Sequence, residues 1–361
     1  MNFGFLDFST LEKRKYFCNQ ELVLNKRLCP EIYDKVVKIT KKDGKLKING
    51  DGEIIDYAVK MKEFSQEKIM TNLLRKEKIN HEIIDKIVDR LVAFYKKEKS
   101  TDEIKEFGKI KTIKQNTDEN FDQTESTIGK TIEKNTFEKI KNLTNRFLDE
   151  KKEFFQKRVE NGFIKDCHGD LHTGNIVVDN DKICIFDCIE FNKRFRYSDV
   201  ASDIAFLGMD LDYQARPYLS SYLIKSYVEK SGDKGIYNIL NFYKAYRAYV
   251  RGKVIGFKLS DPNIDSKEKD DVIKISKRYF DLCYYYILLM SNQLDQEKNI
   301  LFITSGLTGT GKTTVANKIS VDHNAKKIST DEVRKEMIGI DKYERRHEPY
   351  NTGIYSPEKM K

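Results

Sequence analysis

The sequence predicts an α+β domain with a large helical lobe over residues 1–293, followed by the beginning of an α/β domain over residues 298–361. Three observations predict this division. Residues 31–64 alternate apolar and polar side chains and are rich in β-branched residues, which is typical of strands. Residues 198–293 are rich in Tyr, Leu and Ile, which is typical of a helical core. After the polar linker "NQLDQEKN", the run "ILFITS" predicts a buried strand that opens the second domain.

The segments between these landmarks have their own patterns. "EIYDKVVKIT" and "EIIDYAVKMKEF" predict strands joined by a turn at "KKDG", and residues 66–97 predict a helix with Asn80 as a cap. Residues 100–136 are rich in Thr, Asn, Gln and Lys, which predicts a surface insertion or a partly disordered loop. The long run "FEKIKNLTNRFLDEKKEFFQKRVEN" predicts a helix, with Gly162 just beyond its end as a left-handed cap.

Composition excludes few classes of protein. The 66 basic and 57 acidic residues give a charge of +9, but the two signs are interleaved, which favours a solvated surface over a nucleic-acid partner. No apolar run approaches the ~20 residues of a membrane span, and no secretory signal is visible. The six cysteines form no C-x-x-C pair. We therefore predict reduced cysteines in a cytoplasmic protein.

The stretch "DCHGDLHTGNIVVDNDKICIFDCIEFN" carries the strongest candidate for catalysis. Asp170 and Asn175 have the D-x-x-x-x-N spacing of a kinase catalytic loop, and His168 stands two residues before the aspartate, where that loop carries its histidine. Phosphoryl transfer needs a carboxylate that orients the acceptor hydroxyl and accepts its proton. We predict Asp170 and His168 as catalytic residues, with Asp170 as the base.

The residues after Asn175 predict a tight hairpin. If its turn centres on Asn180 and Asp181, Asn175 lies opposite Phe186, and Asp187 is its diagonal neighbour. Mg²⁺ prefers oxygen ligands, so the amide of Asn175 and the carboxylate of Asp187 are the predicted metal ligands. The alternative is an ordinary hairpin whose Asp and Asn side chains serve its turns.

The segment "HGDLHTGNIVV…IFDCIEFNKRFRYSDVASDIAFLGMDL" resembles the aminoglycoside phosphotransferase-like kinases. More closely, the chain resembles bacterial proteins in which such a domain precedes a P-loop ATP-binding domain, and the similarity includes "NFGFLDFSTLEKRKYFCNQELVLNKRL" and "FYKAYRAYVRGKV". The resemblance implies a protein-kinase-like fold, ATP as the donor, Asp170 as the base, and Asn175 and Asp187 as magnesium ligands. Asp199 and Asp203 match acidic family positions, with helix capping as the alternative role.

Two alignments with this family differ at the first strands. In the favoured one, the helix at residues 9–28 has Glu21 facing inward, Tyr57–Lys62 is the strand before the hinge, and Lys60 is a surface lysine. The family's phosphate-binding lysine would then precede Met1, so the chain looks truncated at its start, which leaves the activity of this chain open. In the other alignment, "YAVK" is the lysine strand and Lys60 binds the phosphates.

The segment "GLTGTGKT" fits the P-loop pattern G-x-x-x-x-G-K-[ST], with "NILFITS" as the preceding strand and "TTVANKIS" as the following helix. Its glycines let backbone N–H groups turn toward phosphate oxygens, and the helix N-terminus adds positive potential. Lys312 is predicted to reach the β- and γ-phosphates, and Thr313 to bind Mg²⁺. The predicted nucleotide-binding residues are Gly306, Gly309, Gly311, Lys312, Thr313 and Thr314.

A second predicted strand, "AKKIST", leads into "STDEVRKEM", which resembles the position after strand two in P-loop kinases of small molecules and polynucleotides. That resemblance makes Asp331 a candidate base for an acceptor hydroxyl, with helix capping as the alternative. A P-loop domain needs several strand–helix units to cover its parallel sheet. Its remaining acid would lie beyond Lys361, so this domain is expected to be truncated as well.

The leading hypothesis is an ATP- and Mg²⁺-dependent phosphotransferase acting on a small-molecule hydroxyl, with an attached P-loop module. The alternative is a catalytically silent, nucleotide-binding regulatory protein whose only working site is the P-loop. A nucleic-acid end kinase is a weaker third hypothesis, because no patch of aromatic and basic residues supports it. The sequence names neither the phosphoryl acceptor nor the oligomeric state.

Overall fold

The computed structural model of the chain describes residues 6–180, 182–294, 302–307, 309–322, 325–337 and 339. Contacts divide the chain into two units, Met1–Gln296 and Glu297–Lys361. Within the described ranges, none of the helices combines the length and the apolar character that a membrane crossing requires.

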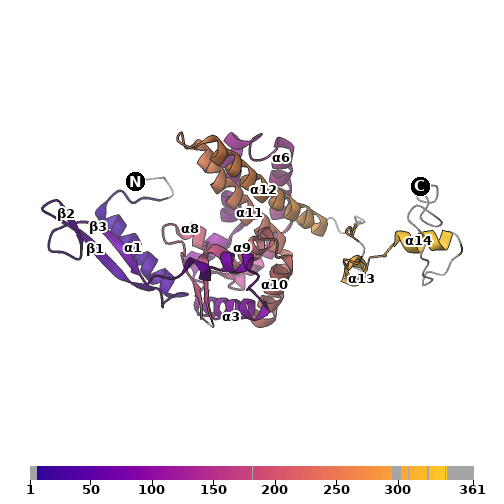
Figure 1. The fold of residues 1–361 in the computed structure, drawn as a ribbon, viewed down its shortest axis with the longest axis horizontal. Coiled ribbons are helices and arrows are strands. Elements are labelled where there is room, and N and C mark those ends of the chain that lie inside the picture. Colours follow the sequence, from indigo (N-terminus) through magenta and orange to yellow (C-terminus); the bar gives the residue numbers. More distant parts are fainter. Residues whose placement is uncertain are drawn as a thin grey trace. The chain divides into compact units, whose positions relative to one another are not determined.

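The first unit opens with a helix on a small antiparallel sheet (Figure 1). α1 (Leu11–Lys26) is capped by Thr10, whose hydroxyl accepts a hydrogen bond from the backbone N–H of Lys13. Asp43 and Gly44, both at positive φ, form the predicted turn. The sheet has the order β2-β1-β3, with bounds β1 (Tyr33–Lys42), β2 (Lys45–Ile48) and β3 (Glu53–Met61). The predicted helix and strands are confirmed, and β2 is an additional strand.

The predicted helix over residues 66–97 is interrupted. A 3-10 turn at Gln66–Lys68 and α2 (Met70–Arg75) come before α3 (His81–Lys97). Between α2 and α3, Glu77 has a φ of +56°, a backbone conformation that an α-helix cannot contain. Asn80 caps α3 as predicted, because its side chain accepts a hydrogen bond from the N–H of Ile83.

Residues 100–136 are mostly helical, which corrects the prediction of a surface insertion or partly disordered loop. They form α4 (Asp102–Lys105), α5 (Ile110–Thr124) and two 3-10 turns. Phe121 of α5 is buried and packs edge-on against the rings of Phe137 and Tyr249. The prediction failed because α5 buries Thr and Asn side chains together with only two large apolar ones, Ile113 and Phe121.

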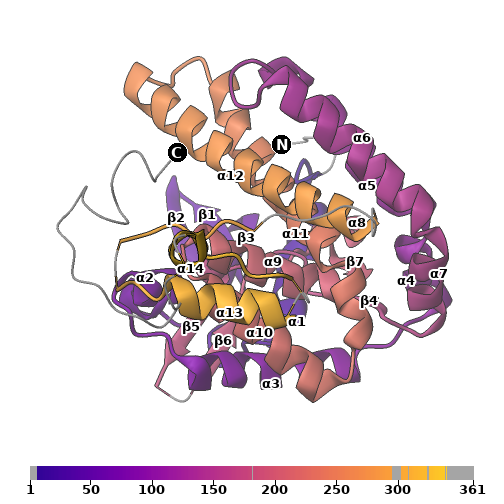
Figure 2. The same ribbon diagram turned by 90° about the vertical axis from the view of Figure 1, so that its right-hand side faces the viewer.

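The helical lobe forms the core of this unit (Figure 2). The predicted long helix is two helices, α6 (Lys134–Glu150) and α7 (Lys152–Glu160), and Gly162 has the predicted positive φ of +74°. α11 packs on α5, α9 and α12, α3 packs on α10, and α12 packs on α6. The predicted helices over residues 198–293 are confirmed as α9 (Val200–Tyr213), α10 (Pro217–Ser231), α11 (Leu240–Gly256) and α12 (Ser266–Leu294), with 3-10 turns at Lys234–Asn238 and Phe257–Ser260.

Two short strand pairs frame the catalytic stretch. β4 (Ile164–Asp166) pairs with β7 (Tyr197–Asp199), and α8 (Lys193–Arg196) stands just before β7. β5 (Ile176–Asp179) pairs antiparallel with β6 (Lys182–Ile185), after a 3-10 turn at Thr173–Asn175. The register of this pair joins Ile176 to Ile185 and Val178 to Ile183. The predicted hairpin is therefore confirmed, and it leaves its open end at Asn175.

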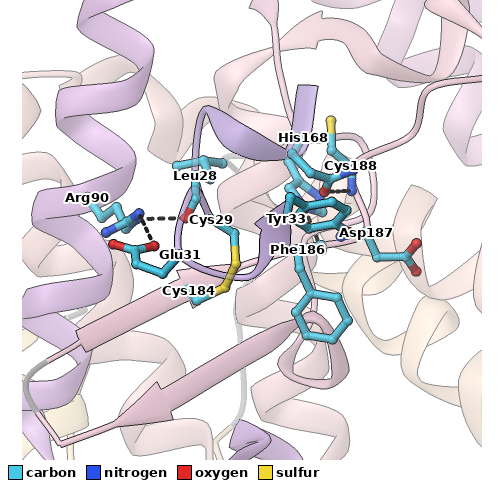
Figure 3. Close-up of a disulfide and its surroundings, with 11 residues drawn as sticks. Leu28, Cys29, Glu31, Tyr33, Arg90, His168, Cys184, Phe186, Asp187 and Cys188 are labelled. Carbon is cyan, nitrogen blue, oxygen red and sulfur yellow. Dashed lines mark hydrogen bonds and ion pairs between the residues drawn. A yellow bond between two sulfur atoms is a disulfide. The ribbon is translucent and has the colours of Figure 1, made fainter. Parts of the chain in front are cut away.

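Cys29 and Cys184 form a disulfide, which corrects the prediction that all six cysteines are reduced (Figure 3). Cys29 lies between α1 and β1, whereas Cys184 belongs to β6. Both are buried in a small cluster with Ile32, Tyr33 and Val177, which brings their Cα atoms to 4.7 Å. No local pattern could reveal this pair, because 155 residues separate the two cysteines.

Alkylation of the unfolded protein, prepared without reductant, is expected to label four thiols, those of Cys18, Cys167, Cys188 and Cys283. The other two of the six cysteines are closed in the disulfide and should react only after reduction. Mass spectrometry of the alkylated chain measures the number of labels. As a control, Cys184→Ser should leave Cys29 free to react. Six labels before reduction would contradict the disulfide.

The second unit has two helices within its described residues, α13 (Lys312–Asp322) and α14 (Thr330–Met337). Residues 302–307 and 325–329 have no strand, which corrects the strands predicted from "ILFITS" and "AKKIST". A strand is defined by hydrogen bonds to a neighbouring strand, and the described part of this unit supplies no such neighbour.

Candidate active site

His168 belongs to the buried scaffold of the catalytic loop. Its Nε2 lies 2.9 Å from the carbonyl oxygen of Phe186, which can only accept, so Nε2 carries the proton. Its Nδ1 then accepts a hydrogen bond of 3.3 Å from the backbone N–H of Asp170. The ring is fully buried, and this burial lowers the pKa of His168. His168 was predicted as a catalytic residue; its contacts position the loop, and a direct part in catalysis stays a prediction.

Asp203 holds the backbone of the same loop. Its carboxylate accepts hydrogen bonds from the backbone N–H groups of His168 at 2.7 Å and Gly169 at 3.0 Å. The Tyr95 hydroxyl donates a third hydrogen bond at 3.2 Å. Asp203 stands inside α9 and therefore does not cap it, whereas Asp199 is the N-cap of that helix. The alternative role of helix capping thus holds for Asp199 only.

Asp170 is held in place from two sides. The Asn175 amide nitrogen donates to Oδ2 of Asp170 and to its carbonyl oxygen, both at 3.1 Å. His172 Nε2 lies 3.4 Å from the same Oδ2. Burial alone would raise the pKa of Asp170, but the hydrogen bond with His172 and the charge of Arg251 oppose this effect, and the pKa is lowered to about 2. Asp170 is therefore ionised at neutral pH. His172 was not among the predicted site residues.

The open end of the hairpin brings Asp187 to this group. The N–H of Phe186 donates to the carbonyl oxygen of Asn175 at 3.0 Å, so these two residues lie opposite one another as predicted. Asp187 follows with a φ of +64°, and its N–H donates to the Tyr33 hydroxyl at 3.3 Å (Figure 3). Burial and the charge of Asp170 raise the pKa of Asp187. Among the described residues, no cation pairs with this carboxylate.

These oxygen atoms fit a hard divalent cation. The Asn175 nitrogen is used by Asp170, so the amide oxygen remains as a ligand, and Asp187 adds a carboxylate in a site already made acidic by Asp170. A cation would favour the ionised forms of both carboxylates. In the described ranges, no three His, Cys, Asp or Glu side chains group as a metal site. A Mg²⁺ ion would thus take an amide oxygen and oxygens from outside the protein as well.

Glu21 of α1 extends the acidic region. Burial and Asp187 raise the pKa of Glu21, and burial, with Glu21 and Asp187, raises the pKa of Glu190 to about 7. No described Lys or Arg side chain pairs with Glu21.

Lys60 is exposed and pairs with Asp34 at 2.9 Å, so it is a surface lysine, as the favoured alignment predicts. The alignment that makes Lys60 the phosphate lysine does not fit the structure.

A cavity of ≈ 790 Å³ opens beside Asp170 and Asp187. Its volume lies within the range of small-molecule sites, roughly 300–1,000 Å³. α5 forms part of the wall, and it lies in the segment that was predicted as a surface insertion or a partly disordered loop. The polar side chains that α5, α8 and α11 contribute are Asn116, Glu119, Asn120, Gln123, Arg194, Tyr246, Arg247, Arg251 and Lys253.

The predicted phosphate loop of the second unit is described in part. Gly309 and Gly311 both have a φ of +83°, and an added Cβ would meet nothing within 4 Å, so glycine is needed there for its backbone conformation alone. Lys312 begins α13, and its ammonium group donates to the carbonyl oxygens of Gly306 at 2.8 Å and Leu307 at 2.6 Å. The helix predicted after the loop is therefore confirmed.

The other predicted residues of the second unit are less fully placed. Thr313 and Thr314 are exposed in the first turn of α13. The backbone of Asp331 belongs to α14, but its side chain lies outside the described part of the structure. Its predicted role as a base therefore stays a prediction.

Part of the first unit is similar to a known protein family. Residues 75–229 match the model of the phosphotransferase enzyme family, and this range contains the catalytic loop, the β5–β6 hairpin and Asp203. The match supports the kinase-like, mixed α/β part of the prediction. This part of the first unit is thus similar to phosphotransferases of the kinase-like type.

Among curated proteins, the chain is similar to uncharacterized proteins of Mycobacterium bovis and of two Mycobacterium tuberculosis strains. Each is 26% identical to it over 333 residues. The alignment covers 92% of this chain but 63% of each relative, so the chain spans less than two thirds of their length.

Proposed function

We propose that the chain transfers the γ-phosphate of ATP to a hydroxyl group of a small molecule, with Mg²⁺ held by Asn175 and Asp187. The observation that carries the proposal is the carboxylate of Asp187, which pairs with no cation among the described residues and adjoins Asn175 and Asp170 at the edge of a cavity of ≈ 790 Å³. The charge of Asp170 disfavours the ionised form of Asp187, and a bound cation would offset that effect. Phosphotransferases of this type use such a site to hold a metal–nucleotide complex.

In this proposal, the residues of the chain have separate tasks. Mg²⁺, when bound, neutralises charge on the phosphates. The ionised carboxylate of Asp170, fixed by Asn175 and His172, orients the acceptor hydroxyl and accepts its proton. Asp203 and His168 hold the loop in one conformation, so little reorganisation is needed when the substrate binds.

The second unit is proposed as a P-loop ATP-binding module. Support comes from the positive φ of Gly309 and Gly311 and from the position of Lys312 at the start of α13. Thr313 would then bind Mg²⁺, and Asp331 would be a candidate base. The alternative function, a catalytically silent nucleotide-binding regulator, predicts that this loop is the only working site. A cytoplasmic location remains a proposal.

Calorimetric titration of Mg²⁺–ATP into three proteins, the wild type, Asp187→Asn and Lys312→Ala, tests both proposals. The wild type is expected to show two binding events. Asp187→Asn should remove one of them, because an amide cannot replace a carboxylate charge on the metal. Lys312→Ala should remove only the other. If Lys312→Ala abolishes all binding and Asp187→Asn changes nothing, the first unit has no nucleotide site, and the phosphotransferase proposal is wrong.

A further inference from the structure

Part of the cavity wall is a polar cluster formed by side chains from α5, α8 and α11. Lys253 donates to the side-chain oxygens of Asn120 and Gln123, both at 2.6 Å. Arg194 donates to Glu119 at 2.6 Å and to Asn116 at 3.0 Å. All of these side chains line the same cavity as Asp170. We call the cluster of Arg194, Lys253, Glu119 and the three amides Asn116, Asn120 and Gln123 the basic wall.

The basic wall has more positive than negative charge. It contains two cations, Arg194 and Lys253, and one carboxylate, Glu119, which Arg194 already binds. The hydrogen-bond partners of Lys253 are neutral amide oxygens, and within the described residues no carboxylate forms an ion pair with it. Burial lowers the pKa of Lys253 to about 8; Glu119 opposes this shift and Arg194 adds to it.

This imbalance indicates the charge of the missing partner. A half-buried ammonium group that has only neutral partners is less stable than one that meets an anion. A cationic ligand would have to approach two cations, and the one carboxylate near them is already bound by Arg194. An anionic group, in contrast, would complete the charge balance and would bind Lys253 and Arg194 with charge-assisted hydrogen bonds.

We propose that the basic wall binds an anionic group, a phosphate or a carboxylate, carried by the phosphoryl acceptor. The acceptor is then a hydroxyl compound with an anionic substituent, such as a sugar phosphate or a polyhydroxy acid, rather than a cationic amino sugar. This proposal rests on the proposed function, because it assumes that the hydroxyl of the same molecule reaches Asp170. The binding of the anion itself does not depend on that assumption.

Inorganic phosphate is the direct probe, titrated without nucleotide or Mg²⁺ into a Lys312→Ala protein, so that the P-loop does not contribute. Phosphate binding is expected in this protein, and Lys253→Gln should weaken it about tenfold or more, the effect of losing a charge-assisted hydrogen bond. Lys253→Arg should retain binding because it keeps the charge. The matched control is Lys225→Gln, which removes an exposed lysine of α10 and should change nothing.

Four hexose derivatives then identify the ligand class: glucose, glucosamine, gluconate and glucose 6-phosphate. Competition with bound phosphate by gluconate or by glucose 6-phosphate shows which anionic group the wall prefers, and glucose should compete least. Absence of phosphate binding, equal binding by Lys253→Gln, or stronger competition by glucosamine would overturn the proposal. If phosphate binds through Lys253 while the nucleotide event that depends on Asp187 is missing, the anion site stands and the phosphotransferase proposal fails.

Discussion

Replacing Asp170 with Asn is expected to lower the rate of phosphoryl transfer by about 10²- to 10⁴-fold, the usual contribution of a general base. The amide keeps the size of the side chain and an oxygen that can accept from Asn175, so the loop should keep its shape. What is lost is the negative charge that orients the hydroxyl and accepts its proton. Release of ADP from ATP measures the rate, with water or a polyol as the acceptor, in a Lys312→Ala background that silences the P-loop.

The matched control is Asp179→Asn, which makes the same chemical change at the far end of the same hairpin. Asp179 is exposed and pairs with Lys68, so the control should affect neither the rate nor the fold. Calorimetric binding of Mg²⁺–ATP should survive in Asp170→Asn, which separates a loss of chemistry from a loss of nucleotide. If Asp170→Asn and Asp179→Asn transfer phosphate at equal rates, Asp170 is not the general base of the reaction.

The candidate site could be predicted as far as its parts lie on one hairpin. The spacing of Asp170 and Asn175 and the two short apolar runs after them predict that Asn175 faces Phe186, and the structure shows that hydrogen bond. Local register carries such information, because pairing in a tight hairpin follows from the turn. The exposed position of Lys60 could also be predicted, since the order of α1 and β3 along the chain is enough to choose between the two alignments.

The remainder of the site depends on contacts between distant segments. The basic wall joins Glu119, Arg194 and Lys253 from three helices, and nothing in the local pattern of any one of them marks a binding site. Cys29 and Cys184 meet in the same way, through packing of the hairpin on the segment before β1. α5 was missed for a different reason: helices that bury polar side chains lack the apolar periodicity on which prediction relies.

In the predicted phosphate loop, the features that depend on local residue types are observed, whereas those that depend on tertiary structure are not. The positive φ of Gly309 and Gly311 and the helix that begins at Lys312 follow from residue types within a few positions, and both are observed. The predicted strands on either side of that loop are not observed in the described residues. A strand depends on a partner that the local sequence does not supply, whereas a glycine-rich turn and a helix start do not.

The largest expected effect on stability is that of Arg158→Met. The guanidinium of Arg158 donates to Asp199 at 2.7 Å and to Asp233 at 2.8 Å, and all three side chains are almost completely buried. Methionine of similar length would leave two buried carboxylates without a cation. Removing one partner of a buried ion pair costs about 3–5 kcal/mol of unfolding free energy. Urea-induced unfolding, followed by circular dichroism, measures the difference from the wild type.

The pH dependence of that loss identifies its cause. Carboxylates left unpaired in a folded interior have raised pKa values, so the folded variant would bind more protons than its unfolded chain, and its stability would fall as pH rises. The deficit of Arg158→Met should therefore be smaller at acidic than at neutral pH. An exposed pair on α6 gives the control: Arg146→Met, which breaks a contact with Glu150, should cost only about 0.3–0.5 kcal/mol. A deficit that does not change with pH would mean that packing, rather than charge, explains the loss. Asp199 is the N-cap of α9, the helix that carries Asp203. If the lost charge explains the deficit, Arg158→Met should therefore also weaken the hydrogen bonds by which Asp203 holds the catalytic loop. If lost packing explains it, the loop should be unaffected.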